Sequence, residues 1–207
     1  MDYNALLLLF AIFVPLAAGL VVVLIRLPRK AVSVIAGIGF VVPALIAIRL
    51  TVAFDPSQAG TFQFTSINDT GLQWLGIHLF LGLNGISLPL FLLAGIVGLA
   101  AGIYALSIEV ERRRAFLFLL LTMLAGLMGT FSSVDIFFFY FFHELALIPT
   151  FILIGIWGGA GRRPAAMKMT IYLTLGALLT LAGLIALGAK LPGAAGLGTE
   201  RLEDGFC

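Results

Sequence analysis

Six long apolar stretches determine what this chain can fold into. Each is long enough to cross the hydrocarbon core of a bilayer as a helix, which takes about 20 residues, and too long to be a membrane-spanning strand. Backbone polar groups in lipid must be paired within the segment, which favours helices. The predicted fold is therefore an all-α, polytopic bundle of about six transmembrane helices. The predicted spans are residues 4–25, 31–54, 85–108, 115–132, 136–157 and 169–189.

Composition agrees with a membrane protein and excludes several other classes. The 207 residues are 61% hydrophobic and 11% charged, whereas a soluble domain has roughly a quarter of charged residues. A formal net charge of +2 is too small for a nucleic-acid-binding surface. The only cysteine, Cys207, excludes a disulfide framework and Cys-ligated zinc or iron–sulfur sites. His78 and His143 are far apart in the sequence, so no metal site is predicted.

The positions of the basic residues predict the orientation of the chain in the membrane. Short cytoplasmic loops accumulate lysine and arginine. The first, third and fifth connections are therefore expected inside and both termini outside. Nine of the 12 Lys and Arg residues lie in these connections: Arg26, Arg29, Lys30, Arg112, Arg113, Arg114, Arg162, Arg163 and Lys168.

We interpret residues 1–190 as one transmembrane domain. The first stretch is expected to be a retained helix rather than a signal peptide, because no positively charged segment precedes it. The longest loop, residues 55–84, contains either an interfacial piece or a β-hairpin, and the sequence does not decide between them. Residues 191–207 are interpreted as a disordered tail or as the place where a longer chain has been truncated.

Glu144 is the candidate functional residue with the clearest physical argument, because it lies well inside the fifth apolar stretch. A carboxyl group near the middle of a membrane costs about 3 kcal/mol, so it is usually retained for a function such as proton transfer. A structural hydrogen bond between helices is the alternative. Pro149, one turn later, leaves a helix carbonyl without its usual donor, which suits either a hydrated path or a simple packing kink.

Three further residues are candidates for the same site. Tyr140 precedes Glu144 by four residues and should share its helix face, where its hydroxyl either donates to the carboxylate or only packs. His143 is either a proton relay or a polar core residue. Lys168 is expected at the start of the sixth span, either as an anchor at the membrane surface or as a cation at the mouth of a proton path.

Four segments make the chain similar to a known family. The segment FFFYFFHELALIPTFILIGIWGG at Phe137–Gly159 resembles the fifth-helix signature of the antiporter-like subunits of proton-pumping NADH:quinone oxidoreductase, respiratory complex I, and most of all chain M, the counterpart of mitochondrial subunit 4. The segments at Leu81–Leu93, Glu111–Tyr140 and Lys168–Leu187 resemble the same family in order and spacing.

The resemblance implies a proton-translocating subunit that works through buried charged residues in a bacterial inner membrane. Glu144 matches the family's membrane glutamate, and Lys168 matches a basic residue at the start of the next helix. The resemblance also implies that quinone, flavin and iron–sulfur clusters belong to partner subunits, and that this chain binds none of them.

Two departures from the family are visible in the sequence. Asn84 stands where the family usually has aspartate, so a charge at that position is absent. The family also has more membrane helices than six, so we expect this chain to correspond to the N-terminal part of a larger fold. A subunit of a cation/proton antiporter or of a membrane-bound hydrogenase, and an inactive fragment, are the alternative interpretations.

Overall fold

The computed structural model describes residues 3–68 and 79–190, and six of its helices are long and apolar enough to cross a membrane. His78, Cys207 and the predicted tail therefore lie outside the described residues. Between the second and third helices lie a short 3₁₀ helix, Pro56–Gln58, and two strands. The remaining elements are α1 Tyr3–Leu24, α2 Arg29–Ala53, β1 Gln63–Asn68, β2 Leu79–Leu83, α3 Ser87–Ser107, α4 Arg113–Ser132, α5 Ile136–Trp157 and α6 Arg162–Lys190.

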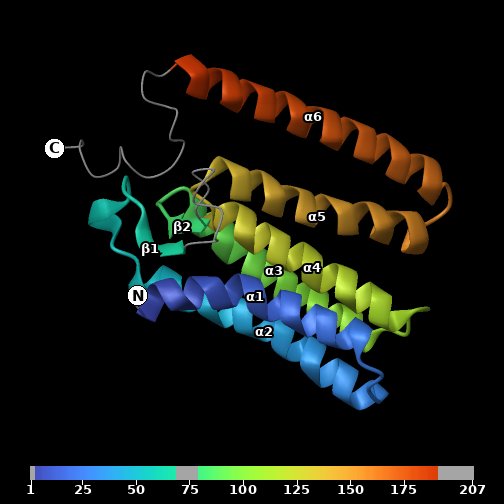
Figure 1. The fold of residues 1–207 in the computed structure, drawn as a ribbon. Helices are drawn as coiled ribbons and strands as arrows, with labels where there is room; N and C mark the ends of the chain where they lie inside the picture. Colours follow the sequence, from blue (N-terminus) through green and yellow to red (C-terminus); the bar gives the residue numbers. More distant parts are fainter. Residues whose placement is uncertain (1–2, 69–78, 191–207) are drawn as a thin grey trace.

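The helices lie side by side in a layered arrangement (Figure 1). Helix α1 packs against α2 and α4, and α3 packs against α2 and α4, so these four form a closed bundle. Helix α5 packs on the outside of α4, and α6 packs on α5. The order of layers therefore leaves α6 as the outermost helix of the described chain.

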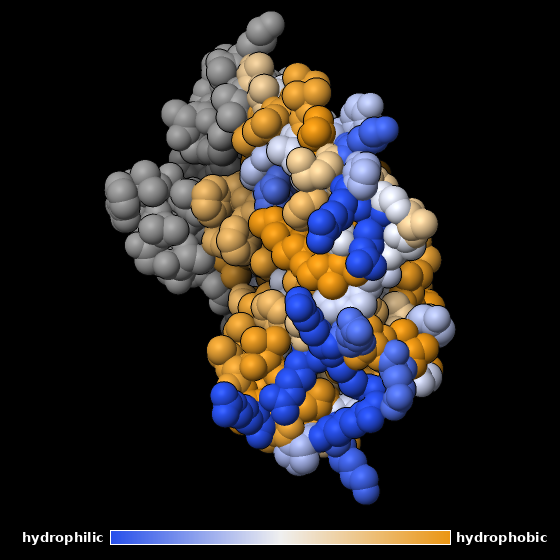
Figure 2. All heavy atoms as spheres, turned by 90° about the vertical axis from the view of Figure 1, so that its right-hand side faces the viewer, coloured by the Kyte–Doolittle hydropathy of each residue, from blue (hydrophilic) through white to orange (hydrophobic). Residues whose placement is uncertain are grey.

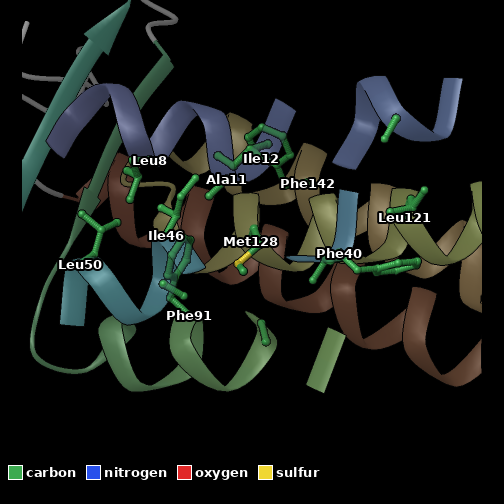
Figure 3. Close-up of a cluster of buried hydrophobic side chains, with 14 of the residues drawn as sticks. Leu8, Ala11, Ile12, Phe40, Ile46, Leu50, Phe91, Leu121, Met128 and Phe142 are labelled. Carbon is green, nitrogen blue, oxygen red and sulfur yellow. The ribbon is translucent and has the colours of Figure 1, made fainter. Parts of the chain in front are cut away.

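Apolar side chains from five of the helices fill the core of the bundle (Figure 3). Phe40 of α2, Phe91 of α3 and Met128 of α4 are completely or almost completely buried. Since lipid is as apolar as these side chains, close packing rather than escape from water holds such helices together. The hydroxyl groups of α4 do not disturb this core, because each donates a hydrogen bond to a carbonyl of its own helix, as Thr122 does to Phe118 at 2.8 Å.

Two glycines of α4 allow α5 to approach closely. A Cβ atom on Gly126 would lie 2.6 Å from the backbone nitrogen of Ala146, and one on Gly129 would lie 2.3 Å from Cγ of Phe142. Both distances are shorter than any real contact, so neither position accepts a larger residue without movement of α5. Small residues at these positions therefore fix where α5 lies.

Three of the helices begin two or more residues earlier than the sequence analysis predicts. Helices α2, α4 and α6 begin at Arg29, Arg113 and Arg162, whereas the apolar stretches begin at residues 31, 115 and 169. Arginine and lysine are good helix formers, and their long side chains reach water from a helix end, so the helices extend through the basic residues. Lys168 consequently lies inside α6 rather than at its first residue.

The long loop contains a β-hairpin, which is one of the two possibilities that the sequence left open. Strands β1 and β2 pair antiparallel, with an irregularity between Gln63 and Ser66 where Phe64 has a left-handed backbone (φ 57°). The backbone N–H of Val134 donates to the carbonyl of Phe80, so the hairpin is tied to the α4–α5 turn. This small sheet is the one departure from an all-α fold among the described residues.

The three basic connections gather at one end of the bundle. In Figure 1 the α1–α2, α3–α4 and α5–α6 connections lie at the right-hand end, opposite the hairpin and the N-terminus. Figure 2 looks onto this arginine-rich end and shows hydrophilic residues spread across it. The clustering is the arrangement that the charge pattern predicts, and the side of the membrane stays a prediction.

Candidate functional site

The start of α5 is fixed by a side-chain cap. Asp135 is buried, and its Oδ1 accepts hydrogen bonds from the backbone N–H groups of Phe137 and Phe138 at 2.8 and 3.1 Å. An aspartate at this position accepts hydrogen bonds from N–H groups that the first helical turn leaves free. Its negative charge also interacts favourably with the positive end of the helix dipole. The cap sets where the helix begins and so fixes the depth of Glu144, nine residues later.

Glu144 lies at the interface between α5 and α6. It lines a cavity of about 90 Å³ together with Leu147, Ile148 and Phe151 of α5 and Met169, Thr170, Leu173 and Thr174 of α6. Its Oε1 atom is buried and has no hydrogen-bond partner among the described residues. A polar atom buried without a partner is costly, so this oxygen of the Glu144 carboxyl group is an unsatisfied polar atom inside a membrane-spanning helix.

Tyr140 lies one helical turn before Glu144, and the two side chains interact. Both also face α6, because Tyr140 lines a second cavity between α5 and α6, of about 300 Å³. The structure therefore brings Tyr140 and Glu144 together, as their spacing of four residues predicts. Whether this contact serves proton transfer stays a prediction.

His143 lines the same larger cavity as Tyr140. Its ring is stacked near the rings of Phe139 and Tyr140, with centroids 6.4 Å apart in each pair. Leu173 of α6 lines both this cavity and that of Glu144, so the two cavities adjoin along α6. His143 and Glu144 thus face the same neighbouring helix, although they line different cavities.

Lys168 is not brought to Glu144. Its side chain is exposed at the arginine-rich end of α6, and Glu144 forms no ion pair with any described residue. The next two residues, Met169 and Thr170, do line the cavity of Glu144. Lys168 is therefore placed near the end of the cavity's lining rather than inside it.

The sequence analysis missed the polar side chains that α6 contributes. Thr170 and Thr174 line the cavity of Glu144, and Tyr172 and Thr180 line the cavity of His143. The signal was present, because residues 170 and 174 are spaced by four and so share a helix face. Without a partner helix to face, however, that spacing gave no reason to connect them with Glu144.

Asn84, where the resemblance predicts a lost charge, has a structural role. Its Oδ1 accepts hydrogen bonds from the backbone N–H groups of Ile86 and Ser87 at 3.1 and 2.8 Å, at the start of α3. An aspartate would accept the same bonds. The substitution therefore preserves the cap while removing the charge.

Comparison with known proteins relates the site to a family. The profile described as "NADH:quinone oxidoreductase/Mrp antiporter, TM" matches residues 133–191, which contain all four candidate residues. The chain is 38% identical over 156 residues to NAD(P)H-quinone oxidoreductase chain 4 3 of Picosynechococcus sp., covering 75% of this chain and 28% of that protein. It is 35% identical over 162 residues to F(420)H(2) dehydrogenase subunit M of Methanosarcina mazei, covering 76% and 32%.

Solved structures show the same relationship in three dimensions. A chain of respiratory complex I from Thermus thermophilus superposes with a TM-score of 0.68 and 29% identity, over 88% of this chain and 36% of that one. The predicted resemblance is confirmed. A chain of the archaeal membrane-bound sulfane sulfur reductase also superposes, with a TM-score of 0.66 and 25% identity, over 87% of this chain and 27% of the other.

The relationship to antiporter-like subunits confirms two expectations at once. The chain is a multi-pass membrane protein, and its helical bundle is that of membrane subunits in oxidoreductase complexes. It spans about a third of the length of the relatives that it matches. The activity and partners of a whole subunit are therefore a matter of proposal for this chain.

Proposed function

We propose that this chain takes part in proton translocation as a membrane subunit of an NADH:quinone oxidoreductase. The carrying observation is Glu144, a carboxyl group between two membrane helices with one buried oxygen that nothing in the described chain satisfies. Ionisable groups within membrane spans are expensive and mark ion and proton pathways. The relatives named as subunits of quinone and F(420)H(2) oxidoreductases support the same interpretation.

The neighbouring side chains suggest how a proton moves at this site. Glu144 takes up and releases the proton, and Tyr140, which interacts with it, orients the carboxyl group. His143 and Tyr140 line the adjoining larger cavity, which is wide enough to hold water between them. Lys168 supplies positive charge near the cavity of Glu144, at the arginine-rich end of α6.

The electron-transfer chemistry belongs to partners in this proposal. Quinone, flavin and iron–sulfur clusters are expected in other subunits, with which this chain assembles in a bacterial inner membrane. The support is that its relatives are membrane subunits of multisubunit complexes. The chain itself contributes the proton path and the contacts with lipid and neighbouring membrane subunits.

The direct test replaces Glu144 by Gln in the assembled complex. We expect proton pumping to fall by about tenfold or more, the effect typical of removing an acid–base group, while the complex still assembles. Thr150→Val is the matched control, because Thr150 lies on the same helix and its hydroxyl only donates to the Ala146 carbonyl. Unchanged pumping in Glu144→Gln at normal assembly would refute the proposed role.

A cation/proton antiporter is the second candidate function. It is supported by the matching family, whose description joins NADH:quinone oxidoreductase with the Mrp antiporter. Transport that continues without any electron donor and requires sodium would favour the antiporter. Transport that stops when the electron donor is removed would favour the oxidoreductase subunit.

A further inference from the structure

The arginine-rich end of the bundle contains a cavity that the proposed proton path does not use. It has a volume of about 510 Å³ and lies between the start of α2, the α3–α4 connection and the start of α4. Arg29, Arg113 and Arg114 line it together with Glu109 and Glu111. Three guanidinium groups against two carboxylates leave the lining with an excess of positive charge.

The carboxylates do not neutralise the inner arginines. Arg29 pairs with Glu109 at 2.6 Å, and both side chains are largely exposed, so this pair is a weak surface interaction. Arg113 and Arg114 form no ion pair with any described residue. The two inner guanidinium groups are thus positive charges without a counter-ion in the described chain.

Backbone carbonyls hold these two guanidinium groups in place. Arg113 donates to the carbonyls of Leu106 and Ile108 at 2.9 and 3.2 Å, at the end of α3. Arg114 donates in the same way to the carbonyl of Leu27, beyond the end of α1. The carbonyls orient both side chains, and Nε of Arg113 remains buried without a hydrogen-bond partner among the described residues.

The cavity lies where a lipid headgroup would lie. It opens at the ends of membrane-spanning helices. Near this end of α3, Tyr104 and Ile103 are exposed in the described chain, at 66% and 59%. Val32 and Val110 add an apolar part to its wall. Basic pockets between helices at such a membrane surface bind anionic lipid headgroups.

We propose that this cavity binds the phosphodiester headgroup of an anionic phospholipid. Guanidinium groups are suited to phosphate oxygens, because their planar donors make charge-assisted, bidentate hydrogen bonds. The acyl chains lie against the uncovered apolar residues of α3. A phosphate bridging Arg113 and Arg114 would join the ends of α1, α3 and α4 at this surface.

The test is native mass spectrometry of the protein purified from its own membranes in mild detergent, with the subunits that accompany it. Phosphatidylglycerol, phosphatidylcholine and inorganic phosphate are added in separate titrations. We expect phosphatidylglycerol to remain bound in preference to phosphatidylcholine. Equal retention of the two lipids would overturn the proposal. Binding of inorganic phosphate without retention of either lipid would also overturn it.

Matched variants separate a built site from general surface charge. Arg114→Gln and Arg29→Gln should each lower phosphatidylglycerol occupancy by about fivefold, the effect expected for one basic residue near an anionic lipid. Lys30→Gln removes the same charge from the same end of α2 without touching the cavity, and should change occupancy by less than twofold. If Arg114→Gln fails to fold, Arg29→Gln decides. An equal loss in Arg29→Gln and Lys30→Gln would overturn the proposal.

Discussion

The closed bundle α1–α4 and the outer pair α5–α6 differ in how much of their apolar surface is buried inside the protein. Buried residues make up 61% of the apolar window of α4, but 17% of that of α5 and 11% of that of α6. The hydroxyl groups within α4 are satisfied by their own helix, whereas Oε1 of Glu144 has no hydrogen-bond partner among the described residues. Packing is therefore concentrated in the inner bundle, whereas the carboxyl group of Glu144 lies in the thinly covered outer layer.

The largest stability effect should separate the two layers. Phe91→Ala empties a fully buried position of the bundle and should cost about 3 kcal/mol of unfolding free energy. Phe141→Ala, on an α5 side chain that is 50% exposed, should cost less than half as much. Thermal unfolding in detergent or in lipid nanodiscs measures both. Equal costs would show that the outer layer is as well packed as the inner one.

The contact between the layers should be almost as sensitive. Gly129→Ala places a methyl group against the Phe142 ring and should cost about 1–3 kcal/mol by overpacking. Gly183→Ala in α6 meets nothing within 4 Å and should be neutral or slightly stabilising, since alanine is the better helix former. A scan of melting temperatures for the two variants checks this. A tolerated Gly129→Ala would mean that α5 can slide on α4.

The cap of α5 should have a smaller effect on stability and a visible one on function. Asp135→Ala removes the acceptor for two backbone N–H groups and should cost about 1 kcal/mol. Because the cap fixes the depth of Glu144, proton transport should also fall. Asp135→Asn keeps an acceptor oxygen and is the control. Both variants can be followed by hydrogen exchange of the first turn of α5, and identical exchange in Asp135→Ala and wild type would contradict the assignment.

The smallest expected effect concerns the loop after α2, outside the spans. The Ser57 hydroxyl donates a hydrogen bond to the Asp55 carboxyl group, and so does the Ser57 backbone N–H. Both bonds lower the pKa of this carboxyl group below its ordinary value, with the larger effect from the hydroxyl. A lowered folded-state pKa means that the stabilisation is present above the unfolded pKa and is lost as pH falls through the folded one.

Ser57→Ala should accordingly raise the pH at which this loop opens in acid, with Thr61→Ala as a neighbouring control. Hydrogen exchange of residues 55–63 between pH 5 and pH 2 provides the measurement. A loop that opens at the same pH in Ser57→Ala and in wild type would contradict the role of Ser57.

Apolar length and charge placement were sufficient to predict most of the fold, because in lipid they leave few alternatives. All six helices and the gathering of basic residues at one end could be read from the sequence. The earlier helix starts and the β-hairpin could not. Arginine is compatible with both a loop and a helix end, and β2, with its partner strand, depends on contacts with the α4–α5 turn.

The candidate site was predictable only in part, for a related reason. Glu144 is conspicuous because a carboxyl group is costly wherever it lies in a membrane. Its pairing with Tyr140 follows from helix geometry alone. The threonines of α6 and the position of Lys168 outside the cavity depend on how two helices face each other, which local spacing does not encode.

The most direct test of the account is infrared difference spectroscopy of the complex during turnover. If Glu144 carries the proton, a carboxyl C=O band should appear or disappear with substrate, be absent in Glu144→Gln and persist in Thr150→Val. A carboxyl difference spectrum that is the same in wild type and Glu144→Gln would show that Glu144 keeps its protonation state throughout, and would contradict the account.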